Sequence, residues 1–165
     1  ERTFRVNILA HFWTTRAFLP DMVERDAGHV VTVASVAGLG GGPRVTDYAA
    51  SKHAAVGFAE SLRMELAETA PGVRTTLVCP WFVDTGMFEG ARTRWPLLLP
   101  FLRPEDVAAR VVKAILRDQT FLQMPPFVRV LPLLKMLPTP MYDASLAFFG
   151  VTHAMDEFVG RENRR

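Results

Sequence analysis

The segment Gly28-His-Val-Val-Thr-Val-Ala-Ser35 decides the fold, because it is a short β-branched run between a break at Ala27-Gly28 and a glycine-rich loop. It is too short for a helix and apolar enough to be buried on both faces, which is typical of an inner strand in a parallel sheet. We therefore predict an inner parallel strand over residues 29–35. The loop that follows contains Gly38 and continues from Gly40 to Pro43.

Helical patterns lie on both sides of this strand. Before it, apolar residues recur at three- and four-residue spacing, which predicts a helix that buries one face and runs to about Arg25. That apolar face consists of Val6, Leu9, Ala10, Trp13, Ala17 and Phe18. After the glycine loop, residues 47–68 are rich in Ala, Leu, Glu and Lys, which predicts a long helix capped at Thr46 or Asp47.

The alternation of helix and strand continues towards the C-terminus. Pro71-Gly72 ends the long helix, and a second β-branched run over Val73–Cys79 predicts a strand that Pro80 closes. Pro104 begins another helix whose first turn is acidic, and a third strand is predicted over Phe121–Met124. This order predicts an α/β fold with a parallel sheet and helices on its faces.

The last part of the chain has a different composition. Between Gln119 and Met155 the only charged residues are Arg129, Lys135 and Asp143, and prolines divide the segment into short pieces that cannot span a bilayer as one helix. We therefore divide the chain into residues 1–124 and an apolar extension over residues 125–165. The extension could lie in a membrane interface, cover a sheet edge or subunit contact, or form a lid over an apolar substrate.

Composition excludes several classes of protein. Lys plus Arg is 19 and Asp plus Glu is 17, so a net charge of +2 gives no reason to expect a nucleic-acid partner. The single Cys79 cannot form an internal disulfide, and the four histidines have no metal-ligand spacing, so no metal site is predicted. The chain begins at Glu1 with residues typical of a helix interior, and we expect it to be part of a larger protein.

Three polar residues are candidates for chemistry at one rim of the sheet. Tyr48 and Lys52 are four apart on a predicted helix, and Ser35 ends a strand where open α/β sheets bind ligands. Tyr-x-x-x-Lys alone is weak support, but the ammonium of Lys52 would lower the pKa of the Tyr48 phenol towards the working range. The Ser35 hydroxyl could orient an alcohol or carbonyl oxygen. The set suits alcohol–carbonyl redox, with a nicotinamide to carry the hydride.

These residues, in the motif Tyr48-Ala-Ala-Ser-Lys52 and with the segment Cys79–Thr85, resemble the C-terminal two thirds of a short-chain dehydrogenase/reductase. The resemblance implies a Rossmann-type doubly wound parallel sheet with its nucleotide-binding strands upstream of Glu1. It also implies that Tyr48 is the general acid/base and that Lys52 holds the nicotinamide ribose while lowering the Tyr48 pKa. Asn7 matches the asparagine that supports this lysine through a water and completes a catalytic tetrad with Ser35.

The resemblance also implies a cofactor-binding loop after the second strand. Pro80, Val83 and Thr85 match the segment that contacts the nicotinamide carboxamide, and Trp81 replaces a glycine of the family pattern and alters the floor of the site. The loop over residues 38–43 does not match a dinucleotide-binding glycine motif, because Pro43 replaces the third glycine. By resemblance it lies beside the substrate. The cofactor is NAD or NADP, and the resemblance slightly favours NAD.

Longer stretches resemble the membrane-associated retinol dehydrogenase branch of this family; they are His11–Pro20, Gly28–Ser35, Thr85–Gly90 and His153–Phe158. The resemblance implies a lipophilic alcohol substrate, with all-trans-retinol and retinal as the first choice. Because the branch includes lipid-droplet 17β-hydroxysteroid dehydrogenases, a steroid is the alternative. It also implies a homodimer packed through the two long helices and a cytosol-facing position on the endoplasmic reticulum membrane or lipid droplets.

A different class of function stays open. The chain could be a noncatalytic interaction module bound to a membrane or lipid droplet, because its sequence lacks a nucleotide-binding glycine motif and ends in an apolar extension. We expect the 165-residue chain to be inactive on its own, since the pyrophosphate site would lie outside it.

Overall fold

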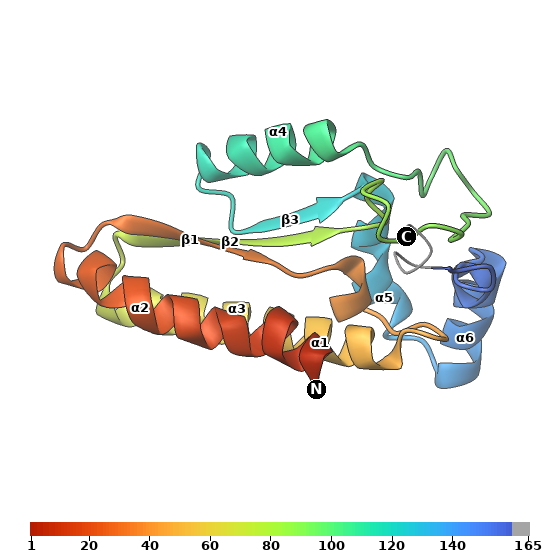
Figure 1. Cartoon of the computed structure of the whole chain (residues 1–165), viewed down its shortest axis with the longest axis horizontal. Helices are drawn as coiled ribbons and strands as arrows, with labels where there is room; N and C mark the ends of the chain where they lie inside the picture. Colours follow the sequence, from red (N-terminus) through yellow and green to blue (C-terminus); the bar gives the residue numbers. More distant parts are fainter. Residues whose placement is uncertain (160–165) are drawn as a thin grey trace.

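Three parallel strands form the centre of the structure, a computed structural model that describes residues 1–159 (Figure 1). The strands are β1 (Gly28–Val33), β2 (Val73–Pro80) and β3 (Phe121–Met124), in the order β1-β2-β3. Gly28 pairs with Val73, and Leu77 pairs with Phe121. The predicted α/β fold with a parallel sheet is confirmed.

β1 lies at one edge of this three-stranded sheet and β2 is central among the described residues. We predicted β1 as an inner strand with further strands upstream of Glu1, and that inner position stays a prediction. β1 also ends at Val33, two residues before Ser35, and the Val33 side chain is 50% exposed.

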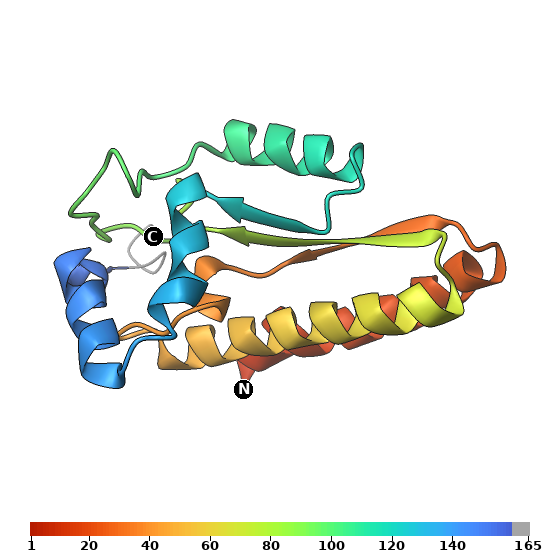
Figure 2. The same ribbon diagram turned by 180° about the vertical axis from the view of Figure 1, so that it is seen from behind.

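Helices cover both faces of the sheet (Figures 1 and 2). The long helices α2 (Ala10–Glu24) and α3 (Thr46–Thr69) lie side by side on one face, and α4 (Pro104–Ile115) lies on the other. Before α2 the chain passes through a short helix α1 (Arg2–Phe4) and a π-helical turn η1 (Arg5–Leu9). The first predicted helix is therefore confirmed in extent, whereas its π turn was not predicted.

The buried face of this first helix is not the one that the sequence indicated. Val6, Trp13 and Phe18 are exposed, the last two at 55% and 66%, whereas Ile8 is buried in a core with residues of α3 and the strands. Leu19 packs against a second core cluster, which lies at the far end of α3 and contains Leu62 and Leu66. The helix carries apolar side chains on two faces, and spacing alone cannot show which face meets α3.

The start of α3 also differs from the prediction. Its N-cap is Val45, and neither Thr46 nor Asp47 caps the helix with its side chain. The Asp47 carboxylate instead accepts a hydrogen bond from Thr3 Oγ1 at 2.8 Å, and this bond lowers the pKa of Asp47. Asp47 still lies in the first turn of α3, where a negative charge favours the helix dipole.

The apolar extension folds into the short pieces that its prolines indicated. They are η3 (Pro126–Val130), α5 (Leu131–Leu134), α6 (Thr139–Phe148) and η4 (Val151–His153). α5 and α6 lie at the end of the sheet towards which the strands point (Figures 1 and 2). Among the helices of residues 1–159, none is long and apolar enough to cross a membrane.

Candidate active site

Ser35 lies where β1 and β2 end. It is the N-cap of a 3-10 turn η2 (Val36–Gly38), and its Oγ accepts a hydrogen bond from the Ala37 amide at 3.1 Å. The same hydroxyl donates to the Pro80 carbonyl at 3.5 Å. Because these contacts join two strand ends, the Ser35 side chain is held at the carboxyl edge of the sheet, where ligands of open α/β sheets bind.

Tyr48 and Lys52 reach the same edge from the first turns of α3. Lys52 Nζ donates a hydrogen bond to the Val33 carbonyl at 3.1 Å and lies 5.8 Å from the centroid of the Tyr48 ring. The Ser35 hydroxyl lies near enough to the Tyr48 phenol to lower its pKa, and both side chains line one cavity. The structure therefore brings together the three residues for which we predicted chemistry, and their catalytic roles stay a prediction.

The electrostatics of this cluster differ from the expectation. Burial raises the pKa of Tyr48, and the Ser35 hydroxyl opposes that rise only in part, whereas we predicted a lowered pKa. Burial also lowers the pKa of Lys52. Removing a group from water disfavours its charged form, so burial acts on the phenol and the amine in opposite directions. Nearby, burial raises the pKa of the Cys79 thiol to about 12, which leaves it unreactive.

Asn7 contacts a residue that the sequence analysis did not single out. Its side-chain amide Nδ2 donates to Ser51 Oγ at 3.0 Å, and Ser51 Oγ donates to the Tyr48 carbonyl at 2.7 Å. The described contact of the Asn7 side chain is with Ser51, and the support of Lys52 by Asn7 through a water that the resemblance implied stays a prediction. A small polar residue on the inner face of a helix, three residues after Tyr48, was the available signal.

The loop after β2 is tied to its neighbours by backbone hydrogen bonds. The Trp81 amide donates to the Met124 carbonyl at 2.8 Å, and Val83 forms an isolated parallel bridge with Leu102. The Thr85 amide donates to the Val83 carbonyl at 2.8 Å. Pro80, Val83 and Thr85 thus follow directly from the strand end that Ser35 contacts. Their predicted contact with a nicotinamide stays a prediction.

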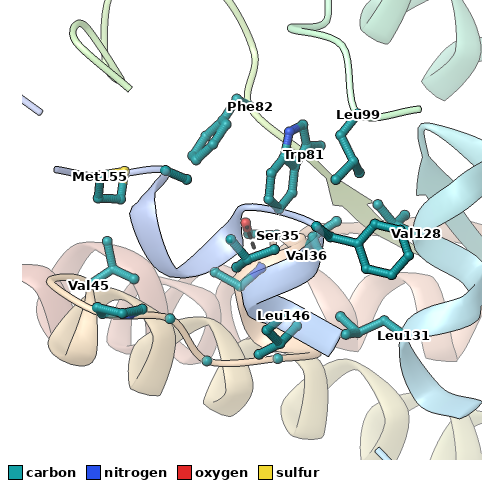
Figure 3. Close-up of a pocket in the computed structure, with 18 of the residues that line it drawn as sticks. Ser35, Val36, Val45, Trp81, Phe82, Leu99, Val128, Leu131, Leu146 and Met155 are labelled. Carbon is teal, nitrogen blue, oxygen red and sulfur yellow. Dashed lines mark hydrogen bonds between the residues drawn. The ribbon is translucent and has the colours of Figure 1, made fainter. Parts of the chain in front are cut away.

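An apolar cavity opens beside these residues (Figure 3). Its wall combines the glycine loop over residues 40–43, the side chains of Trp81 and Leu99, and the apolar extension, which contributes Leu131 and Leu146 among others. Of the described residues that line this cavity, only Ser35 and Tyr48 carry a hydroxyl group. The cavity therefore has its two hydroxyl groups at one end and a mainly apolar wall, to which Trp81 also brings an indole N–H.

At Gly40 the glycine loop packs closely against α5 and α6. A Cβ atom there would lie 2.9 Å from Tyr142 Oη and 3.1 Å from Leu131 Cδ2, so these two side-chain ends would have to move. The loop also lines the cavity. Its implied place beside the substrate stays a prediction.

A parallel sheet with helices on both faces, and with Ser35, Tyr48 and Lys52 at its carboxyl edge, defines a Rossmann-type α/β protein. The family model described as short chain dehydrogenase matches residues 1–95. The chain belongs to this family.

Individual relatives extend the likeness over nearly the whole chain. A Bos taurus protein named short-chain dehydrogenase/reductase family 16C member 6 is 46% identical over 98% of this chain and 52% of its own length. Human epidermal retinol dehydrogenase 2 is 44% identical over 99% of this chain and 54% of its own length. The chain thus spans about half the length of the curated relatives it matches.

A solved structure shows the same fold. A short-chain dehydrogenase/reductase from Burkholderia phymatum, in complex with NAD, superposes with a TM-score of 0.67 at 27% identity. The match covers 94% of this chain and 60% of that chain.

Proposed function

We propose that this chain supplies the proton-transfer and substrate-binding part of an oxidoreductase that interconverts a lipophilic alcohol and its carbonyl. One observation carries the proposal: Ser35 and Tyr48 are the only hydroxyl-bearing residues among the described residues of an apolar cavity, and Lys52 lies beside Tyr48. A substrate with one oxygen and a long apolar body matches this wall. A sugar would leave several hydroxyl groups unpaired against it, which is costly.

The proton chemistry follows from the two hydroxyl groups. Ser35 Oγ holds the substrate oxygen, and Tyr48 Oη gives a proton to it during carbonyl reduction or takes one from it during alcohol oxidation. Because burial raises the pKa of Tyr48, the neutral phenol predominates at neutral pH and suits proton donation. The nearby ammonium of Lys52 favours the phenolate that alcohol oxidation requires.

The residues at the carboxyl edge of the sheet fit a nicotinamide dinucleotide. An ammonium has three N–H donors, so Lys52 Nζ can hold ribose hydroxyls in addition to the Val33 carbonyl that it contacts. Pro80, Val83 and Thr85 would face the carboxamide. When bound, this cofactor supplies the hydride acceptor or donor that side chains lack. The matching solved structures include complexes with NAD and with NADPH, and NAD is the first choice that we propose.

The names of the relatives support retinol as the alcohol substrate, and the pair that we propose is all-trans-retinol and retinal. A steroid alcohol is the rival within the same reaction class. Retinol and estradiol compared side by side on the full-length protein distinguish them, because a flexible chain and a rigid ring system fill an apolar cavity differently. A higher kcat/KM for estradiol would replace retinol in the proposal without changing the chemistry.

The mechanism is tested by a matched pair of tyrosine variants in the full-length protein. The chain has two tyrosines, and we expect Tyr48→Phe to lower turnover of retinol by about a thousandfold, in the range of lost acid–base catalysis. Tyr142→Phe removes a hydroxyl in α6 and should leave turnover unchanged. The absorbance of the reduced nicotinamide cofactor measures the turnover of both variants. Undiminished turnover in Tyr48→Phe excludes the mechanism.

The segment from α5 to the start of α6 supports contact with a membrane surface. Leu133 in α5, Met136 in the turn and Met141 in α6 are exposed, Met136 at 81%, and Lys135 is the only charged residue between them. Exposed apolar side chains beside a cation suit the interface of the endoplasmic reticulum membrane or a lipid droplet. In liposome flotation, Leu133→Ser with Met136→Ser should reduce binding. Binding without any alcohol turnover would favour the noncatalytic interaction module.

The outer face of the first helix supports a homodimer. Val6, Trp13 and Phe18 are exposed apolar residues of η1 and α2, which lie beside α3. Apolar surface of this kind on a helix favours burial against a second copy. We expect Trp13→Glu to shift the full-length protein from dimer to monomer in light scattering. A wild-type monomer would contradict this part of the proposal.

A further inference from the structure

The first turns of α3 are tied to the helical segment that precedes α2. Asn7 Nδ2 donates to Ser51 Oγ at 3.0 Å, and Ser51 Oγ donates to the Tyr48 carbonyl at 2.7 Å. Ser51 is 0% exposed, so its hydroxyl is shielded from water. A buried hydroxyl that both accepts and donates is fully satisfied, and removing it would leave the Asn7 amide without this partner.

A second contact shows that this tie is part of a regular register. Thr3 Oγ1 donates to Asp47 Oδ2, and both this pair and the Asn7–Ser51 pair join residues 44 apart in sequence. The partners advance by four residues on each side, so the two helical segments run parallel. One position beyond Asn7, Ile8 enters the apolar core with Ala55. The Asn7–Ser51 hydrogen bond is therefore a buried polar contact that lies between the exposed Thr3–Asp47 contact and the apolar core.

The tie connects an irregular turn to the residues proposed for catalysis. Asn7 is the central residue of the π-helical turn Arg5–Leu9. π turns are rare and often occur at functional sites, because the extra residue displaces side chains from regular α-helical spacing. Ser51 lies between Tyr48 and Lys52, so a contact at Ser51 acts on the segment of α3 that presents both.

We propose that Ser51 is a positioning residue, whose hydroxyl locks the turn of α3 that carries Tyr48 and Lys52 against the π turn that carries Asn7. The inference rests on the proposed function. Asn7 then acts on the site through Ser51 and the Tyr48 carbonyl. Constraining this carbonyl limits rotation of the Tyr48 backbone and thus the direction of the phenol, while Lys52 keeps its contact with the Val33 carbonyl.

A double-mutant cycle in the full-length protein tests the tie. Asn7→Ala and Ser51→Ala should each lower kcat for alcohol oxidation by about tenfold, because small misplacement of catalytic groups is costly, and KM should change little. The kcat of the double variant should be no lower than that of the less active single variant, because the two side chains act as one unit. Fully additive losses would show that Asn7 acts independently of Ser51 and would overturn the proposal.

A matched control and a conservative variant separate positioning from stability. Ser145 Oγ donates to the Tyr142 carbonyl at 2.6 Å, which is the same local contact in α6 without an asparagine partner. Ser145→Ala should therefore keep wild-type kcat. Ser51→Thr keeps the hydroxyl and should recover kcat, whereas Ser51→Cys, a weaker hydrogen-bonding group of similar size, should not. Wild-type kcat and pH profile in Ser51→Cys or Ser51→Ala would overturn the proposal.

A measurement without turnover distinguishes this inference from the proposed function. In protein labelled with ¹³C at the tyrosine Cζ, the Tyr48 resonance is identified by its loss in Tyr48→Phe. Ser51→Ala, or Ser51→Cys if the alanine variant does not fold, should raise the pH at which this resonance titrates, because a loosened Lys52 stabilises the phenolate less. An unmoved Tyr48 titration excludes the positioning role. Absence of any alcohol turnover by the wild type contradicts only the proposed function.

Discussion

The cavity has two unlike walls. One carries Ser35 and Tyr48 and is held by hydrogen bonds between strand ends and α3, such as Ser35 to the Pro80 carbonyl and Lys52 to the Val33 carbonyl. The other is formed by α5 and α6, where Leu131 and Leu146 belong to an apolar cluster. Proton transfer requires fixed geometry, whereas binding an apolar body requires mainly buried area. The two walls therefore suit different tasks.

This difference separates the expected kinetic effects of changes in each wall. Directional contacts lose their function when one partner is removed, so changes in the polar wall should lower kcat. Apolar packing tolerates changes of shape more readily, so changes in the apolar wall should act on KM and on stability.

After Tyr48→Phe, the largest effect is expected for Lys52→Met, which keeps the length of the side chain and removes its charge. We expect kcat to fall by about a hundredfold or more, because the phenolate loses its nearby cation and the cofactor ribose loses its donor. Lys135→Met, a matched change at an exposed lysine in the apolar extension, should leave steady-state kinetics unchanged. Equal effects of the two substitutions would erase the distinction between the walls.

The pH dependence should come from the polar wall alone, because Tyr48 is the only ionisable residue among the described residues that line the cavity. Burial raises its pKa, so the phenolate fraction rises with pH across the neutral range. The rate of alcohol oxidation should therefore increase about tenfold per pH unit below that pKa. Carbonyl reduction, which uses the neutral phenol, should stay level and decline only as the pH passes the Tyr48 pKa. A falling oxidation rate over the neutral range would contradict the assignment.

The apolar wall is tested by Leu146→Ala. Leu146 is buried, and its truncation should lower the free energy of unfolding by about 2–4 kcal/mol. The KM for a long apolar alcohol should rise by about tenfold while kcat changes little, since the lost contact area serves binding. Leu133→Ala, at an exposed leucine of the same extension, should change neither stability nor KM appreciably. A loss of kcat in Leu146→Ala with unchanged KM would contradict the division of tasks.

The smallest effect is expected where the two walls meet. A Cβ at Gly40 would press on Tyr142 Oη, so Gly40→Ala should destabilise the fold by about 1 kcal/mol. The Tyr142 hydroxyl is buried and has no hydrogen-bond partner among the described residues. Tyr142→Phe removes it and should recover part of the lost stability in the double variant. Thermal unfolding of the three variants measures this coupling. Strictly additive changes would show that the contact does not matter.

The elements with strong local signals were predicted well. β3 has the predicted bounds, β2 is one residue longer, and α4 begins at Pro104 with an acidic first turn. The errors concern relations between elements. The apolar face around Trp13 is exposed, and Asp47 contacts Thr3 instead of capping α3. Each of these depends on a partner distant in sequence.

The candidate site was predictable to a similar degree. The spacing of Tyr48 and Lys52 and the position of Ser35 at a strand end were sufficient to predict their convergence. Ser51 was missed because its importance comes from Asn7, 44 residues away. The predicted direction of the Tyr48 pKa shift was also wrong, because the shift depends on how deeply the phenol is buried by the segments that pack over it.

The sequence by itself determined the alternation of helices and strands, the helical face shared by Tyr48 and Lys52, and the division of the extension by proline. These features follow from local backbone geometry and from periodicities of two and 3.6 residues. Only the tertiary structure decided which helix face is buried, which hydroxyls enter the cavity, and that Asn7 contacts Ser51. Burial and hydrogen-bond partners are set by segments that meet in space, and local periodicity does not encode which segments these are.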